Sequence, residues 1–252
     1  MATRNRPAKV TRFVVVSDSH GDQADEQTTS AVLAFCKDFK PQIRIHAGDA
    51  WDFRQLRKGA SDDERAASLE DDWEAGTDFL RRFFDGGTRN VFLRGNHDER
   101  MWHFAGSATG LLRDYALAGI GRIKVLMGKC QARMLPYDAA LGILELGQLK
   151  VLHGYHIGVG ACRQHAMVYG NCLFGHVHTI ESAPVARLDP AEARSIGCLC
   201  KRDMEYVNAR TGKLRWGQGW AYGLLFDDGS YQLFQTRKIA GRFHYAAEIK
   251  DC

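Results

Sequence analysis

The stretch NVFLRGNHDER, residues 90–100, begins as an apolar strand and ends in a group of polar side chains. After Gly95 come Asn96, His97 and Asp98 in succession. An amide, an imidazole and a carboxylate placed together where a strand stops are the side chains of a metal-binding or acid–base site. This stretch therefore indicates that functional side chains of the fold lie where its strands end.

The same transition, from an apolar strand to a ligand-type side chain, occurs at four other places. They are VVVSDSH (14–20), IHAGD (45–49), VLHG (151–154) and LFGHVH (173–178). Ligands of open α/β sheets bind at the carboxyl ends of strands, so these five ends can converge on one place. Asp18 and His20 are two residues apart, as are His176 and His178, and the strand period of two points both members of a pair the same way.

The order of apolar runs predicts strands and helices in alternation, followed mostly by strands. The spacing of apolar residues predicts helices in 28–39, 61–84, 99–117 (with a break near Gly106) and 158–170. Strands are expected in 12–18, 41–49, 90–95, 122–127, 142–147, 148–154 and 171–176, with a hairpin in 219–236 that turns at Asp228-Gly229. This pattern predicts a layered α/β domain with a mixed sheet or a pair of sheets.

The composition is that of a globular chain. It has 252 residues, 45% of them hydrophobic, and 26 Gly against 5 Pro, which is enough to bury a sizeable core. We expect a single domain over 1–252, with the motif-bearing core in 12–180 and strands of 181–252 completing the sheets. The net charge of +4, from 34 basic and 30 acidic residues, is too small to indicate nucleic acid or a membrane surface as partner by itself.

The cysteines and the chain start predict a cytoplasmic location. The seven cysteines include no CxxC pair, which argues against a disulfide framework and a zinc ribbon and favours reduced thiols. The polar segment 1–9 leads straight into a strand instead of an apolar leader, and no apolar run is long enough to span a membrane.

Taken together and in this order, the five blocks resemble the signature of the calcineurin-like metallophosphoesterases, which reads D-x-H, G-D, G-N-H-D/E, H and G-H-x-H. The match runs from Phe13 to His178, about two thirds of the chain, and every block is present. A single block would be weak, but five in order are a strong signal. The resemblance implies a four-layer α/β/β/α sandwich of two mixed sheets flanked by helices.

The resemblance also implies two divalent metal ions bound by seven residues. One ion would be held by Asp18, His20, Asp49 and His178, and the other by Asp49, Asn96, His153 and His176. Asp49 would bridge the two. His97 would be the proton donor, and Asp98 would orient its imidazole. A hydroxide that bridges the ions would be the nucleophile, with Mn²⁺ as first choice of metal and Fe, Zn, Ni or Mg as alternatives.

Several residues beside the blocks are candidates for substrate contact, and each also has an ordinary structural explanation. Those we expect to touch substrate are Arg94, Arg100, Trp51 and His156, while Arg54 and Trp102 also flank the blocks. The segment 206–220, YVNARTGKLRWGQGW, mixes basic and aromatic residues, which suits nucleic acid and equally suits a solvated hairpin.

The substrate is less sharply defined than the chemistry. GDAWDF and GNHD differ from the GDYVDRG and GNHE that protein Ser/Thr phosphatases share, which argues against that branch. We expect a hydrolase of phosphoester bonds, foremost a phosphodiesterase acting on nucleic acid or a nucleotide-like compound. The alternatives are a phosphomonoesterase acting on a small soluble phosphate and, in another class, a non-catalytic metal-binding scaffold. The oligomeric state and the pathway are not predicted.

Overall fold

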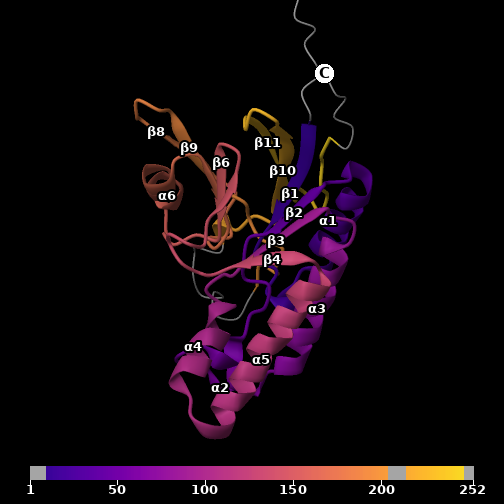
Figure 1. Ribbon diagram of the computed structural model, residues 1–252, viewed down its shortest axis with the longest axis vertical. Coiled ribbons are helices and arrows are strands. Elements are labelled where there is room, and N and C mark those ends of the chain that lie inside the picture. The colour runs from indigo at the N-terminus through magenta and orange to yellow at the C-terminus, as the bar shows by residue number, and fades with distance from the viewer. Residues whose placement is uncertain (1–9, 204–213, 247–252) are drawn as a thin grey trace, which may run out of the picture.

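The computed structural model describes residues 10–203 and 214–246, which form two mixed β-sheets flanked by helices (Figure 1). The first sheet contains β11 (Tyr231–Arg237), β10 (Gly219–Phe226), β1 (Val10–Val16), β2 (Ile43–His46), β3 (Arg89–Leu93) and β4 (Ala132–Leu135), in that order. The second contains β5 (Leu144–Leu146), β6 (Leu149–Leu152), β7 (Cys172–Phe174), β9 (Ala191–Ser195) and β8 (Ser182–Val185). The predicted pair of mixed sheets is confirmed.

The strands that precede the five blocks are parallel within each sheet. In the first sheet β1, β2, β3 and β4 pair in parallel, and β10 and β11 are added antiparallel at the edge next to β1. In the second sheet β6, β7 and β9 are parallel, with β5 and β8 antiparallel at the edges. Parallel strands end at one edge of a sheet, so the residues after β1, β2 and β3 lie together, as do those after β6 and β7.

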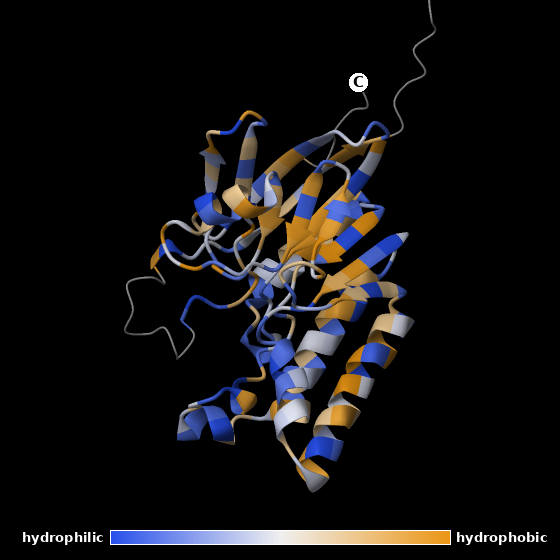
Figure 2. Cartoon of the chain, turned by 60° about the vertical axis from the view of Figure 1, so that its left-hand side comes forward, coloured by the Kyte–Doolittle hydropathy of each residue, from blue (hydrophilic) through white to orange (hydrophobic). Residues whose placement is uncertain are grey.

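The layers follow from the alternation of side chains along β1. Phe13 and Val15 face the second sheet, in an apolar cluster with Leu173 of β7. Val14 and Val16 point the other way, into a cluster shared with the helices. Figure 2 shows the apolar residues concentrated in the strands, whereas the helices carry polar and apolar residues in alternation.

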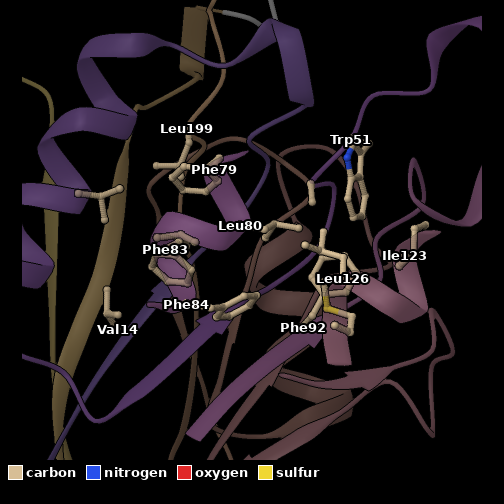
Figure 3. Packing of buried hydrophobic residues seen from close by; sticks show 14 of the residues in the cluster. Val14, Trp51, Phe79, Leu80, Phe83, Phe84, Phe92, Ile123, Leu126 and Leu199 are labelled. Carbon is tan, nitrogen blue, oxygen red and sulfur yellow. The ribbon is translucent and has the colours of Figure 1, made fainter. Parts of the chain in front are cut away.

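Helices cover the outer face of each sheet. The helices are α1 (Glu26–Phe39), α2 (Asp62–Ala66), α3 (Leu69–Phe84), α4 (Glu99–Ser107), α5 (Gly110–Lys129) and α6 (Ala161–Tyr169), with short 3₁₀ turns at Gly21–Gln23 and Arg54–Leu56. The apolar faces of α1, α3 and α5 pack on the first sheet, where Figure 3 shows side chains of α3 and α5 beside Val14 and Phe92. Helix α6 packs on the second sheet through Ala166 and Phe174.

One predicted strand is wrong. Residues 122–127, RIKVLM, belong to the last two turns of α5 instead of a strand. Ile123, Leu126 and Met127 are buried at helical spacing, while Val125, which a strand would have placed beside Ile123, is 57% exposed. The alternation of apolar and basic residues resembles a strand, but the longer repeat that begins at Ala116 is helical and determines the structure.

The C-terminal hairpin is confirmed: β10 and β11 pair from Gly219 opposite Arg237 to Leu225 opposite Tyr231. The turn contains Gly229 at φ 82°, and Asp228 Oδ1 accepts a hydrogen bond from Ser230 N at 2.8 Å. In the basic and aromatic segment 206–220, residues 206–213 lie outside the described part of the chain. Among the described residues, no helix is long and apolar enough to cross a membrane.

Candidate metal centre

The seven predicted ligands all follow the carboxyl ends of strands. Asp18 and His20 come after β1, Asp49 after β2, Asn96 after β3, His153 directly after β6, and His176 and His178 after β7. His178 of the second sheet lies 3.2 Å from Asp18 of the first. The convergence expected from the sequence is therefore present in the fold.

The first group of potential ligands combines Asp18, His20 and Asp49, whose ligand atoms lie within 4.8 Å of one another. His178 adjoins this group, because its Nε2 lies 3.2 Å from Asp18 Oδ1 and 3.2 Å from His20 Nε2. Carboxylate oxygens and imidazole nitrogens that face one another in a buried position are a donor set for Zn, Fe, Mn or Ni.

The second group combines Asp49, His153 and His176 within the same 4.8 Å limit. His153 Nε2 lies 3.3 Å from Asp49 Oδ2, and the Asn96 side-chain oxygen lies 3.0 Å from the same Nε2. Asp49 is therefore common to both groups. Several His and Asp groups could hold metal ions here, and their arrangement fits a pair of ions on either side of one carboxylate.

The backbone is strained at these residues. Nine non-glycine residues of the described chain have positive φ, and five of them are predicted ligands: Asp18 (58°), His20 (53°), Asp49 (55°), His176 (68°) and His178 (58°). A non-glycine residue in this region costs free energy and is retained where its surroundings hold it in place. Such concentration at one place indicates a functional site.

Two glycines let the loops approach closely. A Cβ on Gly95 would lie 2.1 Å from Asp49 Oδ1, and one on Gly175 would lie 1.9 Å from Ser17 Oγ and 2.6 Å from Asp18 Oδ2. Any other residue would push the loop away from a predicted ligand. Gly95 of GNHD is therefore required where the loops after β2 and β3 meet, and Gly175 of GHVH where a loop of the second sheet meets the loop after β1.

Hydrogen bonds orient the predicted ligands. His153 Nδ1 lies 2.8 Å from the carbonyl oxygen of Ala47, which requires the proton on Nδ1 and leaves the Nε2 lone pair for the site. The backbone N–H of His97 donates to Asp49 Oδ1 at 2.8 Å, and that of His176 donates to Asp18 Oδ2 at 3.0 Å.

The two carboxylates are ionised. Burial alone would raise the pKa of Asp18, but the neighbouring His178 outweighs it and lowers the pKa to about 2. For Asp49 burial is likewise outweighed, here by His153 and His97, and its pKa lies well below the ordinary value. Both side chains are thus negative at neutral pH, as metal binding requires.

His97 lies beside these groups, with its Nε2 4.0 Å from Asp49 Oδ2. Its Nδ1 is hydrogen-bonded to Asp52 Oδ1 at 2.6 Å, and the same oxygen lies 3.2 Å from Nδ1 of His20. Asp52 thus orients both the predicted proton donor and a predicted ligand. Burial opposes ionisation of Asp52, but the hydrogen bond from His20, followed by that from His97, lowers its pKa far below the ordinary value.

Asp98 does not have the role predicted for it. Its Oδ2 accepts hydrogen bonds from the backbone N–H groups of Asp49 and Gly95, both at 2.8 Å. Its Oδ1 accepts from Ala50 at 3.0 Å and Trp51 at 3.2 Å. The carboxylate fixes the loop after β2 against the loop after β3, and the carboxylate at His97 Nδ1 is that of Asp52. Sequence reasoning missed Asp52, whose one signal is an acidic residue three positions after Asp49 in GDAWDF.

Of the predicted substrate contacts, Arg100 is the one in the site. Its guanidinium Nη2 lies 3.1 Å from His97 Nε2 and its Nη1 donates to the Asp52 carbonyl oxygen at 2.6 Å. Arg94 instead lies 3.0 Å from the Glu99 carboxylate and stacks on Trp102, with its guanidinium carbon 4.0 Å from the ring centroid.

The predicted substrate contact of Trp51 is wrong. Its side chain is fully buried, lies 5.9 Å from the parallel ring of Phe53, and belongs to the core between the first sheet and its helices (Figure 3). The ring of His156 packs edge-on to that of His165, with centroids 4.9 Å apart. Contacts of His156 and Arg94 with substrate stay predictions.

Comparisons with known proteins give limited overlap. No family model matches the chain. One curated relative, the Gene 54 protein of Mycobacterium phage D29, is 31% identical over 111 residues, which cover 42% of this chain. The matched region spans only 43% of that relative's length.

Solved structures match over more of the chain but at low identity. Vps29 (a D62A mutant) from Entamoeba histolytica is 11% identical, covers 93% of this chain and 96% of its own, and has a TM-score of 0.48. The phosphoesterase YfcE from E. coli is 14% identical, covering 89% and 98%, with a TM-score of 0.39. The nuclease MPE from Pseudomonas putida is 13% identical, covering 88% and 87%, also at 0.39. Their TM-scores are all below 0.5, so these likenesses support no conclusion about function. The family resemblance rests on where the fold places the motif blocks.

That placement confirms the resemblance drawn from the sequence. Blocks from two sheets, as far apart in the chain as Asp18 and His178, form two groups of potential metal ligands that share Asp49. The chain thus resembles the calcineurin-like metallophosphoesterases both in the order of its five blocks and in the way its fold gathers them around one carboxylate.

Proposed function

We propose that the protein is a metal-dependent phosphoesterase whose two divalent ions share the Asp49 carboxylate. The observation that supports this most directly is the pair of ligand groups with Asp49 in common. Bound there, such ions would activate water and hold phosphoryl oxygens during an in-line displacement. Only Asp18 and Asp49 are anionic among the seven predicted ligands, so the loaded site is positive and attracts phosphate.

The chain's own residues supply the proton and the orientation. Asp52 accepts the hydrogen bond from His97 Nδ1 at 2.6 Å and directs Nε2 toward the ligand groups. In its protonated form His97 gives the Nε2 proton to the leaving oxygen, which accelerates such reactions by roughly 10²–10⁴-fold. Arg100 Nη2 donates to the Nε2 lone pair of the neutral ring at 3.1 Å, so protonation of His97 breaks this bond and leaves the guanidinium to bind a phosphate oxygen beside the leaving group.

The substrate that we infer is a phosphodiester of nucleic acid or of a nucleotide-like compound. A cationic pocket lined by Arg202, Arg237 and Lys238 adjoins the site. Such a pocket favours a substrate that continues beyond the cleaved phosphate, as a diester does. The second candidate is a phosphomonoesterase on a small soluble phosphate. Mn²⁺ remains the first choice of metal, and a cytoplasmic location stays a prediction.

The test compares bis-p-nitrophenyl phosphate with p-nitrophenyl phosphate in the presence of Mn²⁺. We expect the diester to be the better substrate, Asp49→Asn to lose both metal and activity, and His97→Ala to keep the metal while kcat falls roughly 10²–10⁴-fold. His103→Ala, an exposed histidine on α4, is the control and should behave as the unaltered protein.

Three results would change the assignment. A greater turnover of the monoester would favour the phosphomonoesterase. Bound metal without turnover of either compound would indicate the non-catalytic scaffold. Failure to bind metal would contradict both proposals at once.

A further inference from the structure

From the arrangement around Trp216 we infer that the cationic pocket (Arg202, Trp216, Gln218, Arg237 and Lys238) binds the strand of a single-stranded nucleic acid on one side of the cleaved phosphate. This inference rests on the proposed function, because it takes the scissile phosphate to lie at Asp49. It narrows the substrate class from phosphodiesters in general to those with further phosphates.

The pocket begins one side chain away from the ligand groups. The Trp216 ring, which lines it, packs edge-on to the ring of His178 with centroids 4.1 Å apart. The next residue, Gly217, donates its N–H to the carbonyl oxygen of His178 at 2.8 Å. The wall of the pocket is therefore fixed to a predicted metal ligand.

The charge of the pocket is positive. Arg202, Arg237 and Lys238 line it, and no acidic residue of the described chain does. Lys238 is fixed by an ion pair to Asp25 at 3.0 Å. Arg202 and Arg237 are exposed, and within residues 10–203 and 214–246 no carboxylate lies within ion-pair distance of either. These two guanidiniums are thus available to bind phosphate groups.

The volume of the pocket and the kinds of side chain that line it favour a nucleic acid over other polyanions. The pocket has a volume of about 380 Å³, near the lower end of the roughly 300–1,000 Å³ typical of ligand sites, so it suits one unit of a chain. Trp216 packs on the predicted ligand His178 and lines the pocket together with the guanidinium groups of Arg202 and Arg237. A single strand alternates phosphates with bases that stack on aromatic side chains. A lipid would require more apolar lining than Leu214 and Ala240 provide.

A second basic pocket provides a matched control. It has a volume of about 520 Å³, is lined by Arg81, Arg82 and Lys129 among others, and includes Asn90 at the start of β3. It therefore lies at the amino end of that strand, whereas the predicted ligands follow carboxyl ends. Its cations should not contribute to substrate binding.

The experiment measures binding of a fluorescent single-stranded DNA of about 12 nucleotides to the metal-free protein by anisotropy, with an RNA of the same sequence as a second arm. The double variant Arg202→Gln/Arg237→Gln should bind the strands about tenfold or more weakly, and the slope of log affinity against log salt should decrease by about 1.4, for two lost phosphate contacts. Arg81→Gln should bind normally. With Mn²⁺ present, Arg81→Gln should leave turnover of bis-p-nitrophenyl phosphate unchanged, since Arg81 lines neither the ligand groups nor the cationic pocket.

A third variant separates a nucleic acid from a simple polyanion. Trp216→Ala should weaken binding of the DNA about tenfold through lost stacking, but should leave binding of inorganic polyphosphate unchanged, and Trp216→Phe should restore DNA binding. Normal DNA binding by the double arginine variant, or an equal loss in Arg81→Gln, would overturn the inference. So would equal losses for DNA and polyphosphate in Trp216→Ala. Arginine-dependent DNA binding by a protein that hydrolyses no phosphoester would instead uphold the pocket and refute the proposed function.

Discussion

His97 and Asp52 are joined by a hydrogen bond of 2.6 Å between Nδ1 and Oδ1, although 45 residues separate them in the chain. The same carboxylate oxygen lies 3.2 Å from Nδ1 of His20. One side chain therefore couples the proposed proton donor to a predicted metal ligand. Asp52 is itself held by Asp72 of α3, whose carboxylate accepts the backbone N–H groups of Asp52 and Phe53 at 3.0 and 2.7 Å.

Replacing Asp52 should damage both functions that it supports. In Asp52→Asn the ring of His97 loses its charged partner, and that of His20 loses the negative charge that raises its basicity. Partners of this kind are typically worth about 10–100-fold in metal affinity or activity, so we expect losses of that size in kcat at saturating Mn²⁺ and in metal affinity. Asp62→Asn, an exposed residue of α2, is the control. Unchanged kcat and metal affinity would show that the dyad has no role.

Replacing Asp98 should lower the free energy of unfolding more than it affects the chemical step. In Asp98→Ala four backbone N–H groups lose their acceptor, and each buried donor left unsatisfied costs about 1–3 kcal/mol. We expect the free energy of unfolding, measured in urea, to fall by about 3 kcal/mol or more. Near-normal stability combined with a large loss of kcat would support the orienting role first predicted from the sequence.

Two glycine substitutions should have opposite effects. Gly95→Ala places a Cβ 2.1 Å from Asp49 Oδ1 and should reduce metal affinity and stability together. Gly121→Ala, in the middle of α5, places a methyl group where no atom lies within 4 Å, and should stabilise the protein by about 0.5–1 kcal/mol. Thermal unfolding and metal titration of both variants measure this. Normal metal binding by Gly95→Ala would mean that the two loops are less tightly apposed than described.

Acid should destabilise the protein through His165. Burial lowers the pKa of His165 to about 4, and its neutral ring accepts from Tyr155 N at 3.0 Å while donating to the Ala161 carbonyl at 2.8 Å. Because the folded-state pKa is depressed, this stabilisation is present above pH 6.5 and is lost as the pH falls toward 4. Over that range it amounts to about 3 kcal/mol.

The measurement is the urea midpoint of the protein and of His165→Gln across pH 4–7.5, both with EDTA so that metal release does not contribute. The variant should show a shallower decline between pH 6.5 and 4. Parallel curves would mean that His165 takes up its proton in the folded state as readily as in the unfolded chain.

The parts of the fold that could be predicted are those with local signals. Apolar strands that end in Asp or His beside Gly predicted the five strand ends, because a parallel sheet brings its carboxyl ends together. The prediction of a strand at 122–127 is wrong because these six residues alternate like a strand, while the helical repeat that determines the structure begins at Ala116.

The parts of the site that could not be predicted depend on contacts between loops. The sequence places Asp98 next to His97, but α4 begins at Glu99 and the Asp98 side chain turns to four N–H groups of neighbouring loops. Asp52 reaches His97 only because the loops after β2 and β3 lie side by side. Trp51 belongs to the loop after β2. The residues next to it in the sequence do not indicate that its ring is buried against Phe53 and Trp73.

The most direct measurement of the central claim is an anomalous difference map from crystals of the protein grown with Mn²⁺. We expect two peaks, separated by roughly 3.5–4 Å, both in contact with the carboxylate of Asp49, one near Asp18 and His178 and the other near His153 and His176. A single peak, or two peaks of which one does not touch Asp49, would contradict the account.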